Sequence, residues 1–254
     1  MFQPLILLLQ AGYHTAQNAS HGYSAATSGM FLLMIAIGVA GYVVQARLQS
    51  VFKKYSRVQF PGGLTGAQVA EQMLRDNRIY NVKVTHVGGH LTDHFNPQTM
   101  TVNLSDSVYS STSVAAAAVA AHECGHAVQH ARGYAPLALR SQLVPVVQFA
   151  SSAATWVIIA GLVLMASTQN DIVCWIGVAL LAPTALFSLI TLPVEYNASE
   201  RALEWLQSSH TMQGAQLVQA REALRWAART YLVAALSAVA SVLYWIFLIL
   251  GRRD

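Results

Sequence analysis

Four long stretches of the chain carry no charged side chain. They are residues 1–46, 141–170, 172–194 and 230–251. An α-helix needs about 20 apolar residues to cross the hydrocarbon core of a bilayer, so each stretch can hold one crossing. The pattern predicts four membrane-spanning helices, near residues 24–44, 143–166, 172–192 and 231–250. Residues 1–10 are also apolar, but they are too few to span.

The first large polar segment, residues 47–142, has the patterns of a small α+β domain. Thr65-Gly66-Ala67-Gln68 fits a capping box, and apolar residues follow at helical spacing, so a helix is expected over 66–76. Residues 82–87 and 100–104 alternate in polarity, which predicts a hairpin-like pair of strands. Ser113 then offers a cap for an alanine-rich helix, and Gly133 lies where that helix could stop.

The second polar segment, residues 193–230, is expected to be helical. Pro193 suits the first turn of a helix that runs through Gln207, and another helix begins near Gln213 and continues into the last span. The predicted organisation is therefore an N-terminal segment with the first span (1–46), a polar domain (47–142), two spans (143–192), polar helices (193–230) and a last span (231–254).

Composition and charge support a mainly α-helical membrane protein. Of 254 residues, 54% are hydrophobic and 10% are charged, against about 25% charged in a soluble domain. Basic residues beside the predicted spans gather on one side: Arg47, Lys53, Lys54, Arg57, Arg132, Arg140, Arg201, Arg221, Arg225 and Arg229, against Arg252 and Arg253 on the other. The positive-inside rule then places both polar segments in the cytoplasm and both termini outside. A net charge of +4 also fits contact with anionic lipid. The favoured explanation of the basic balance is the ordinary excess of Lys and Arg in cytoplasmic segments. No basic-aromatic pattern indicates nucleic-acid binding.

The candidate chemistry lies in His122-Glu123-Cys124-Gly125-His126. Positions i and i+4 of a helix share one face, so both imidazoles can reach one metal ion, and Glu123 is placed to take a proton from a metal-bound water. Catalytic zinc typically takes three protein ligands. Glu195 is the favoured third ligand, because an acid at the end of an apolar run is costly unless it is paired or bound to metal.

Other residues stay open for this position. An acid near a helix N-terminus is also stabilised by the helix dipole, which would explain Glu195 without a metal. Glu200 and Glu204 rank behind it as acids of an amphipathic surface. His130 extends the histidine face, but one straight helix cannot wrap three turns around a single ion, so a neighbouring or interfacial role is expected. His94 belongs to a histidine-rich turn that could line the cleft.

Three motifs resemble the YugP-type family of bacterial neutral zinc metallopeptidases. They are Leu91-Thr92-Asp93-His94-Phe95-Asn96-Pro97, Val119–His130 around the two histidines, and Leu192-Pro193-Val194-Glu195-Tyr196-Asn197-Ala198-Ser199. The family is itself similar to the membrane peptidases of the HtpX and CAAX-prenyl-protease type, in which the third zinc ligand is the Glu of an E-x-x-A-D stretch. That Glu corresponds to Glu195, and the Asp position is Ser199 here, so Asn197 or Ser199 could orient a ligating histidine instead.

The expected protein is an integral zinc endopeptidase of the bacterial inner membrane, with a zincin-like domain and its site at the cytoplasmic face. Zn²⁺ is held by His122, His126 and Glu195, with Glu123 as the base, and the substrate is a peptide or membrane protein. The resemblance implies that the strand at 100–105 is an exposed edge strand that pairs with the extended substrate; its residues there are Val102, Asn103 and Leu104. Candidates for stabilising the oxyanion are Tyr109, His94, Tyr196 and Arg201. The alternative is a membrane scaffold or adaptor with a structural zinc.

Overall fold

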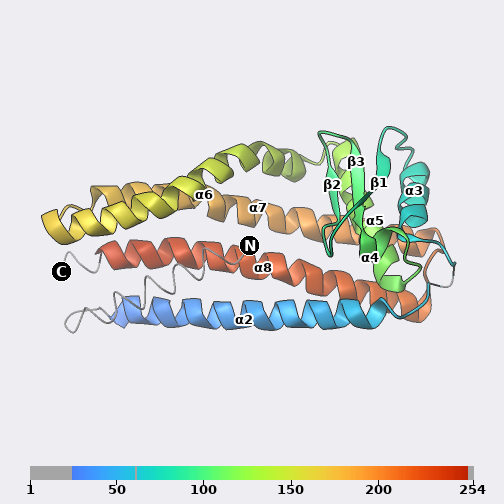
Figure 1. Ribbon diagram of the computed structural model, residues 1–254, viewed down its shortest axis with the longest axis horizontal. Coiled ribbons are helices and arrows are strands. Elements are labelled where there is room, and N and C mark those ends of the chain that lie inside the picture. Colours follow the sequence, from blue (N-terminus) through green and yellow to red (C-terminus); the bar gives the residue numbers. More distant parts are fainter. Residues whose placement is uncertain (1–24, 61, 251–254) are drawn as a thin grey trace. The chain divides into compact units, whose positions relative to one another are not determined.

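The computed structural model describes residues 25–60 and 62–250, so the apolar segment 1–10 lies outside the described part. The chain is mainly helical (Figure 1). Its four longest helices are α2 (Ala25–Tyr55), α6 (Ala135–Thr168), α7 (Ile172–Ser208) and α8 (Gly214–Leu250). All four are long and apolar enough to cross a membrane. The prediction of a mainly helical protein with four such helices is confirmed.

The chain divides into two compact units, and each long helix contributes to both. Unit 1 comprises residues 1–43, 143–189 and 233–254. Its described residues include a single charged side chain, that of Asp171. In unit 1, glycines let α6 and α7 approach closely: a Cβ added at Gly161 would lie 2.8 Å from the Cys174 backbone nitrogen, and one at Gly177 would lie 2.5 Å from Ile158. Small residues at helix contacts are typical of apolar helices packed in a bilayer.

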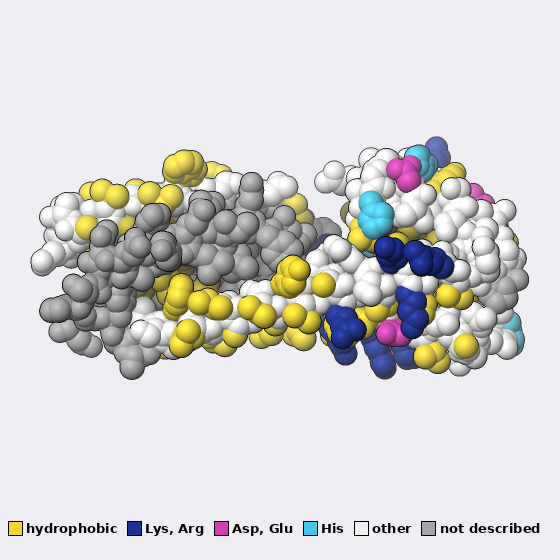
Figure 2. All heavy atoms as spheres, turned by 60° about the horizontal axis from the view of Figure 1, so that its bottom comes forward, with side chains coloured by type: hydrophobic (Ala, Val, Ile, Leu, Met, Phe, Trp, Pro, Cys, Tyr) yellow, Lys and Arg dark blue, Asp and Glu magenta, His cyan; other side chains and the backbone are white. Residues whose placement is uncertain are grey.

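Unit 2 comprises residues 44–142 and 190–232. It contains α3 (Gly66–Asp76), three strands, the short α4 (Asp106–Tyr109) and α5 (Val114–Ala131). The alanine-rich α5 is almost entirely buried and forms the centre of the hydrophobic core together with α3 and β3. Every Lys and Arg among the described residues belongs to unit 2. On the face drawn in Figure 2, several basic side chains gather over this unit.

Local end signals place the helices of unit 2 where the sequence predicts them. Thr65 and Gln68 form the reciprocal capping box of α3. The hydroxyl of Ser113 accepts a hydrogen bond from the Ala116 backbone N–H and caps α5. Gly133 follows the end of α5 with a φ of +63°, a conformation that glycine adopts at little cost. The predictions for these two helices are therefore confirmed.

The sheet differs from the predicted hairpin. The strands β1 (Lys83–Val87) and β3 (Thr101–Ser105) are neighbours, but they run parallel. The connecting segment 88–100 crosses to the far side of β3 and contributes a third strand, β2 (His94–Asn96), which pairs antiparallel with β3. The order is β1-β3-β2, so β3 is the central strand (Figure 1). Both the hairpin prediction and the idea of an exposed edge at 100–105 are wrong.

A second correction concerns Pro193, which lies inside the unbroken helix α7 instead of starting a new one. A proline within a helix removes one backbone donor, which packed apolar helices tolerate. The helix that was expected to begin near Gln213 and to continue into the last span is confirmed as α8.

Candidate metal centre

Helices α5 and α7 bring the candidate ligands together in unit 2. His122 and His126 lie one turn apart on α5, and Glu195 comes from α7. The two helices approach closely because Gly125 has no side chain: a Cβ there would lie 2.5 Å from the carbonyl oxygen of Ala198. The glycine and the small alanine therefore set the spacing across which the three side chains meet.

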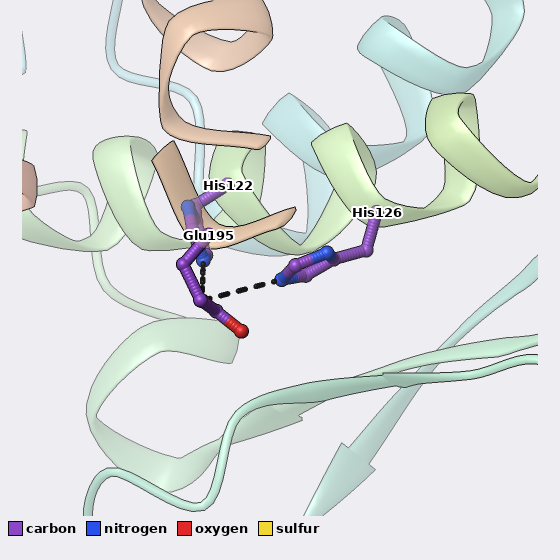
Figure 3. A group of neighbouring side chains, drawn as sticks. All are labelled: His122, His126 and Glu195. Atoms are coloured by element: carbon purple, nitrogen blue, oxygen red, sulfur yellow. Dashed lines mark hydrogen bonds and ion pairs between the residues drawn. The ribbon is translucent and has the colours of Figure 1, made fainter. Parts of the chain in front are cut away.

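One carboxylate oxygen of Glu195 faces both imidazoles. Its Oε2 lies 3.3 Å from Nε2 of His122 and 3.6 Å from Nε2 of His126 (Figure 3). The two rings are nearly perpendicular, with centroids 4.9 Å apart. The three ligand atoms lie within 4.8 Å of one another. Residues far apart in sequence thus converge on one small volume.

This arrangement fits a tetrahedral zinc ion. Two ligand atoms that each lie about 2.1 Å from such an ion are about 3.4 Å apart, close to both of the measured nitrogen–oxygen distances. A carboxylate with only 2% of its side chain exposed also needs compensation for its charge. The chemistry of the donor set, two imidazoles and one carboxylate, matches a catalytic zinc site that keeps one position open.

Each candidate ligand is held by further side chains. The Nδ1 atom of His122 lies 3.1 Å from the hydroxyl of Ser199, and the Nδ1 atom of His126 lies 3.0 Å from Oε1 of Gln129. Both histidines therefore turn Nε2 toward Glu195, as metal-ligating histidines do when Nδ1 has another partner.

The Glu195 carboxylate has further partners. Arg140 of α6 places a guanidinium nitrogen 3.6 Å from Oε1, and Tyr231 of α8 interacts with the same carboxylate. Sequence reasoning did not find Arg140, Tyr231 or Gln129 as site residues. Arg140 was noted only for its charge beside a span, and no local pattern marks the other two.

Glu123 lies beside the cluster and is largely buried. Its Oε2 accepts a hydrogen bond of 3.0 Å from the backbone N–H of Phe95 in β2. Since β2 is an edge strand, this N–H faces α5 instead of the sheet. This hydrogen bond fixes the direction of the Glu123 carboxylate.

Electrostatics at His126 favour a positively charged ring. Burial by itself would lower the pKa of His126, but the hydrogen bond that the ring donates to Glu195 and the charges of Glu195 and Glu123 outweigh it, so the pKa is raised. The same negative charges would attract a metal cation.

Some of the other residues singled out in the sequence contact a candidate ligand or its partners, and the rest have different neighbours. Ser199 contacts His122, and Asn197 accepts hydrogen bonds from Gln129 and Arg201. His94 is hydrogen-bonded to Thr92 and Asn103. Tyr109 meets the His86 ring edge to face, and His130 lies against Phe95 with its ring tilted. Tyr196 is exposed.

The proposed substrate strand requires a correction. Val102 and Leu104 are fully buried, and the amide of Asn103 is bonded to neighbouring side chains. Because β3 is paired on both sides, its backbone has no free row of donors and acceptors for a peptide.

A His-His-Glu cluster with a second carboxylate beside it, in a chain with four apolar helices, is typical of membrane metallopeptidases. The family described as "Putative neutral zinc metallopeptidase" matches residues 30–250, and the chain belongs to this family. A relative from Bacillus subtilis (strain 168), named "Putative membrane protease YugP", is 39% identical over 225 residues, which cover 89% of this chain and 98% of the relative. No solved structure matches the chain. The resemblance carried by the three motifs is confirmed, and the chain is a multi-pass membrane protein of a zinc metallopeptidase family.

Proposed function

We propose that this protein is a zinc-dependent endopeptidase of the bacterial inner membrane. The observation that carries the proposal is the convergence of His122, His126 and Glu195 with Glu123 beside them. Both histidine–Glu195 distances are close to those between ligands of a tetrahedral zinc ion, and the second carboxylate, that of Glu123, is in the position of a general base. Family membership supports peptide hydrolysis as the reaction.

Zinc bound at this site supplies a Lewis acid that lowers the pKa of water and polarises the scissile carbonyl. Glu123 takes the proton from the attacking water and returns it to the leaving amine. The Phe95 N–H keeps the Glu123 carboxylate oriented throughout this transfer. Arg140 and Tyr231 are further candidates for stabilising the negatively charged oxygen, because both lie against the cluster at Glu195.

The substrate is proposed to bind in extended form along β2. This strand is the edge of the sheet that lies against α5, and its Phe95 is already in contact with the proposed base. Because the Phe95 N–H is held by Glu123, the peptide would pair with the remaining outward backbone groups of β2, which gives affinity with little demand on the peptide sequence. Unfolded segments of peptides or membrane proteins are therefore the expected substrates.

We place the site at the cytoplasmic face of the membrane. The argument is that all described Lys and Arg residues belong to unit 2, which also contains the ligand cluster. Basic residues beside apolar spans are retained in the cytoplasm. Both ends of the chain then lie outside.

Cleavage of an unfolded peptide by the purified full chain in detergent, with and without a chelator, tests this function. The wild type should cleave, the chelator should abolish cleavage, and added zinc should restore it. Glu123→Gln should keep zinc and lose at least ~10²-fold in rate, the usual scale for a general base. A variant that binds zinc and cleaves like wild type would contradict the role of Glu123.

The second candidate function is a membrane scaffold with structural zinc. Structural sites are usually closed by four protein ligands, whereas three candidate ligand atoms converge among the residues that the structure describes. Zinc binding without any chelator-sensitive cleavage, over a range of unfolded substrates, would favour the scaffold.

A further inference from the structure

Gln129 is the polar side chain that joins the ligand helix α5 to α7. It is fully buried and has three hydrogen-bonding neighbours. Its Nε2 donates to the carbonyl oxygen of Val194 at 2.8 Å and to Oδ1 of Asn197 at 3.0 Å, while its Oε1 lies 3.0 Å from Nδ1 of His126. Val194 directly precedes Glu195, so Gln129 ties one candidate ligand to the backbone beside another.

The hydrogen-bonding chemistry of these neighbours assigns the nitrogen and the oxygen of the Gln129 side-chain amide. A carbonyl oxygen such as that of Val194 only accepts hydrogen bonds. The Asn197 atom must also be an oxygen, because the Arg201 guanidinium, which has only donors, contacts it through Nε at 2.8 Å. The Gln129 atom that faces both acceptors must therefore be the NH₂ group, and the oxygen must face His126.

The orientation of Gln129 in turn fixes the tautomer of His126. An amide oxygen can only accept, so Nδ1 of His126 carries the hydrogen. In the neutral ring the lone pair then sits on Nε2, the atom that faces Glu195. His122 differs, because the Ser199 hydroxyl on its Nδ1 can donate or accept and leaves the tautomer free.

We propose that Gln129, held by Asn197 and Arg201, is a positioning residue that presents Nε2 of His126 to the metal. The proposal rests on the zinc site of the proposed function. Arg201 and Asn197 act only through Gln129. None of Arg201, Asn197 and Gln129 belongs to the candidate ligand group, so the expected effect is on metal affinity.

Competition for zinc between the full chain in detergent and a coloured chelator measures this effect. Gln129→Met keeps the length of the side chain but removes its donors and its acceptor. Its zinc affinity should fall by about 10- to 100-fold, the usual loss when a partner of a ligating histidine is removed. Gln219→Met is the matched control, because Gln219 lies on α8 in the same unit and its Oε1 is buried without a hydrogen-bond partner. The control should bind zinc like wild type.

The substitutions at Asn197 separate positioning from packing. Asn197→Asp keeps an oxygen that accepts from both Gln129 and Arg201, so its zinc affinity should stay within a few-fold of wild type. Asn197→Ala removes that oxygen and should weaken binding. If packing alone mattered, the charged aspartate should disturb the half-buried site at least as much as alanine does.

Double substitutions test whether the residues act as one chain. Asn197→Ala added to Gln129→Met should cause little further loss, because Asn197 acts through Gln129. Ser199→Ala added to Gln129→Met should give the sum of the two losses in binding free energy, because Ser199 acts on the other histidine.

Wild-type zinc affinity in Gln129→Met, or equal losses in Asn197→Asp and Asn197→Ala, would overturn the proposal while leaving the zinc site intact. If Gln129→Met does not fold, the two Asn197 variants decide alone. Failure of the proposed function looks different: wild-type protein would not bind zinc, or His122→Ala would bind it unchanged.

Discussion

Replacing Gly125 by alanine would place a methyl group where α5 and α7 touch. The added carbon would lie 2.5 Å from the Ala198 carbonyl oxygen and 3.1 Å from its carbon atoms. Ordinary contact begins at 3.4 Å, so the helices must separate locally by about 0.9 Å, on a steep repulsive potential. Metal sites tolerate deviations of only about 0.2 Å in ligand distance. Because Gly125 lies between the two histidines and Ala198 lies one turn after Glu195, the shift falls directly on the ligand geometry.

Gly125→Ala should therefore weaken zinc binding by about 10-fold or more, and overpacking should lower the free energy of unfolding by roughly 1–3 kcal/mol. Chelator competition and chemical unfolding of the metal-free protein measure the two effects. Gly88→Ala is the control, because a Cβ at Gly88 meets no atom within 4 Å. If Gly125→Ala bound zinc as tightly as the control, the close approach of α5 and α7 at Gly125 would not set the ligand geometry.

Further predictions concern the third ligand, the pH dependence of zinc binding and of stability, and the topology. Glu195→Ala should lose most of the zinc, whereas Glu200→Ala should keep it; full occupancy in the first variant, by metal analysis, would refute the third ligand. The raised pKa of His126 means that protons compete with zinc, so affinity should increase as the pH rises above 6.5, the ordinary value of a histidine. A zinc affinity that stays flat over this range would contradict the competition between protons and zinc. In the metal-free protein, the ion pair between His126 and Glu195 should add to stability below pH 6.5, and this contribution should be lost as the pH rises through the raised pKa of His126. Cysteine probes should be labelled from outside the cell at Thr168 and shielded at Arg57, and the reverse pattern would invert the topology.

Features with a local cause were predictable from the sequence. The helix at 66–76 has the bounds that its capping box suggests, and α5 begins and ends at its predicted cap and glycine. Glu195 could be proposed as a ligand because a carboxylate at the end of an apolar run needs compensation. The four long helices follow from the length of the uncharged stretches.

Features that depend on distant partners were not predictable. Gln129 reads as an ordinary helix residue until Val194 and Asn197 are placed beside it. Arg140 and Tyr231 come from other helices, and each is defined as a site residue only by its contact with Glu195. Their roles are tertiary, so neither spacing nor composition could indicate them.

The sheet shows why an alternating pattern is not enough to assign a substrate edge. The pattern at 100–105 correctly indicates a strand, but alternation reports which face is buried and not which strands flank it. Val102 and Leu104 are buried because β3 is central. The edge strand that contacts α5, β2, has only three residues, and it is too short to show any alternation. Its position is instead revealed by one hydrogen bond, from Phe95 to Glu123, which joins the free edge of the sheet to the residue proposed as the base. A peptide that lies beside β2 would therefore meet Glu123, while the Phe95 N–H stays with that carboxylate and the remaining outward backbone groups pair with the peptide, whatever its side chains are.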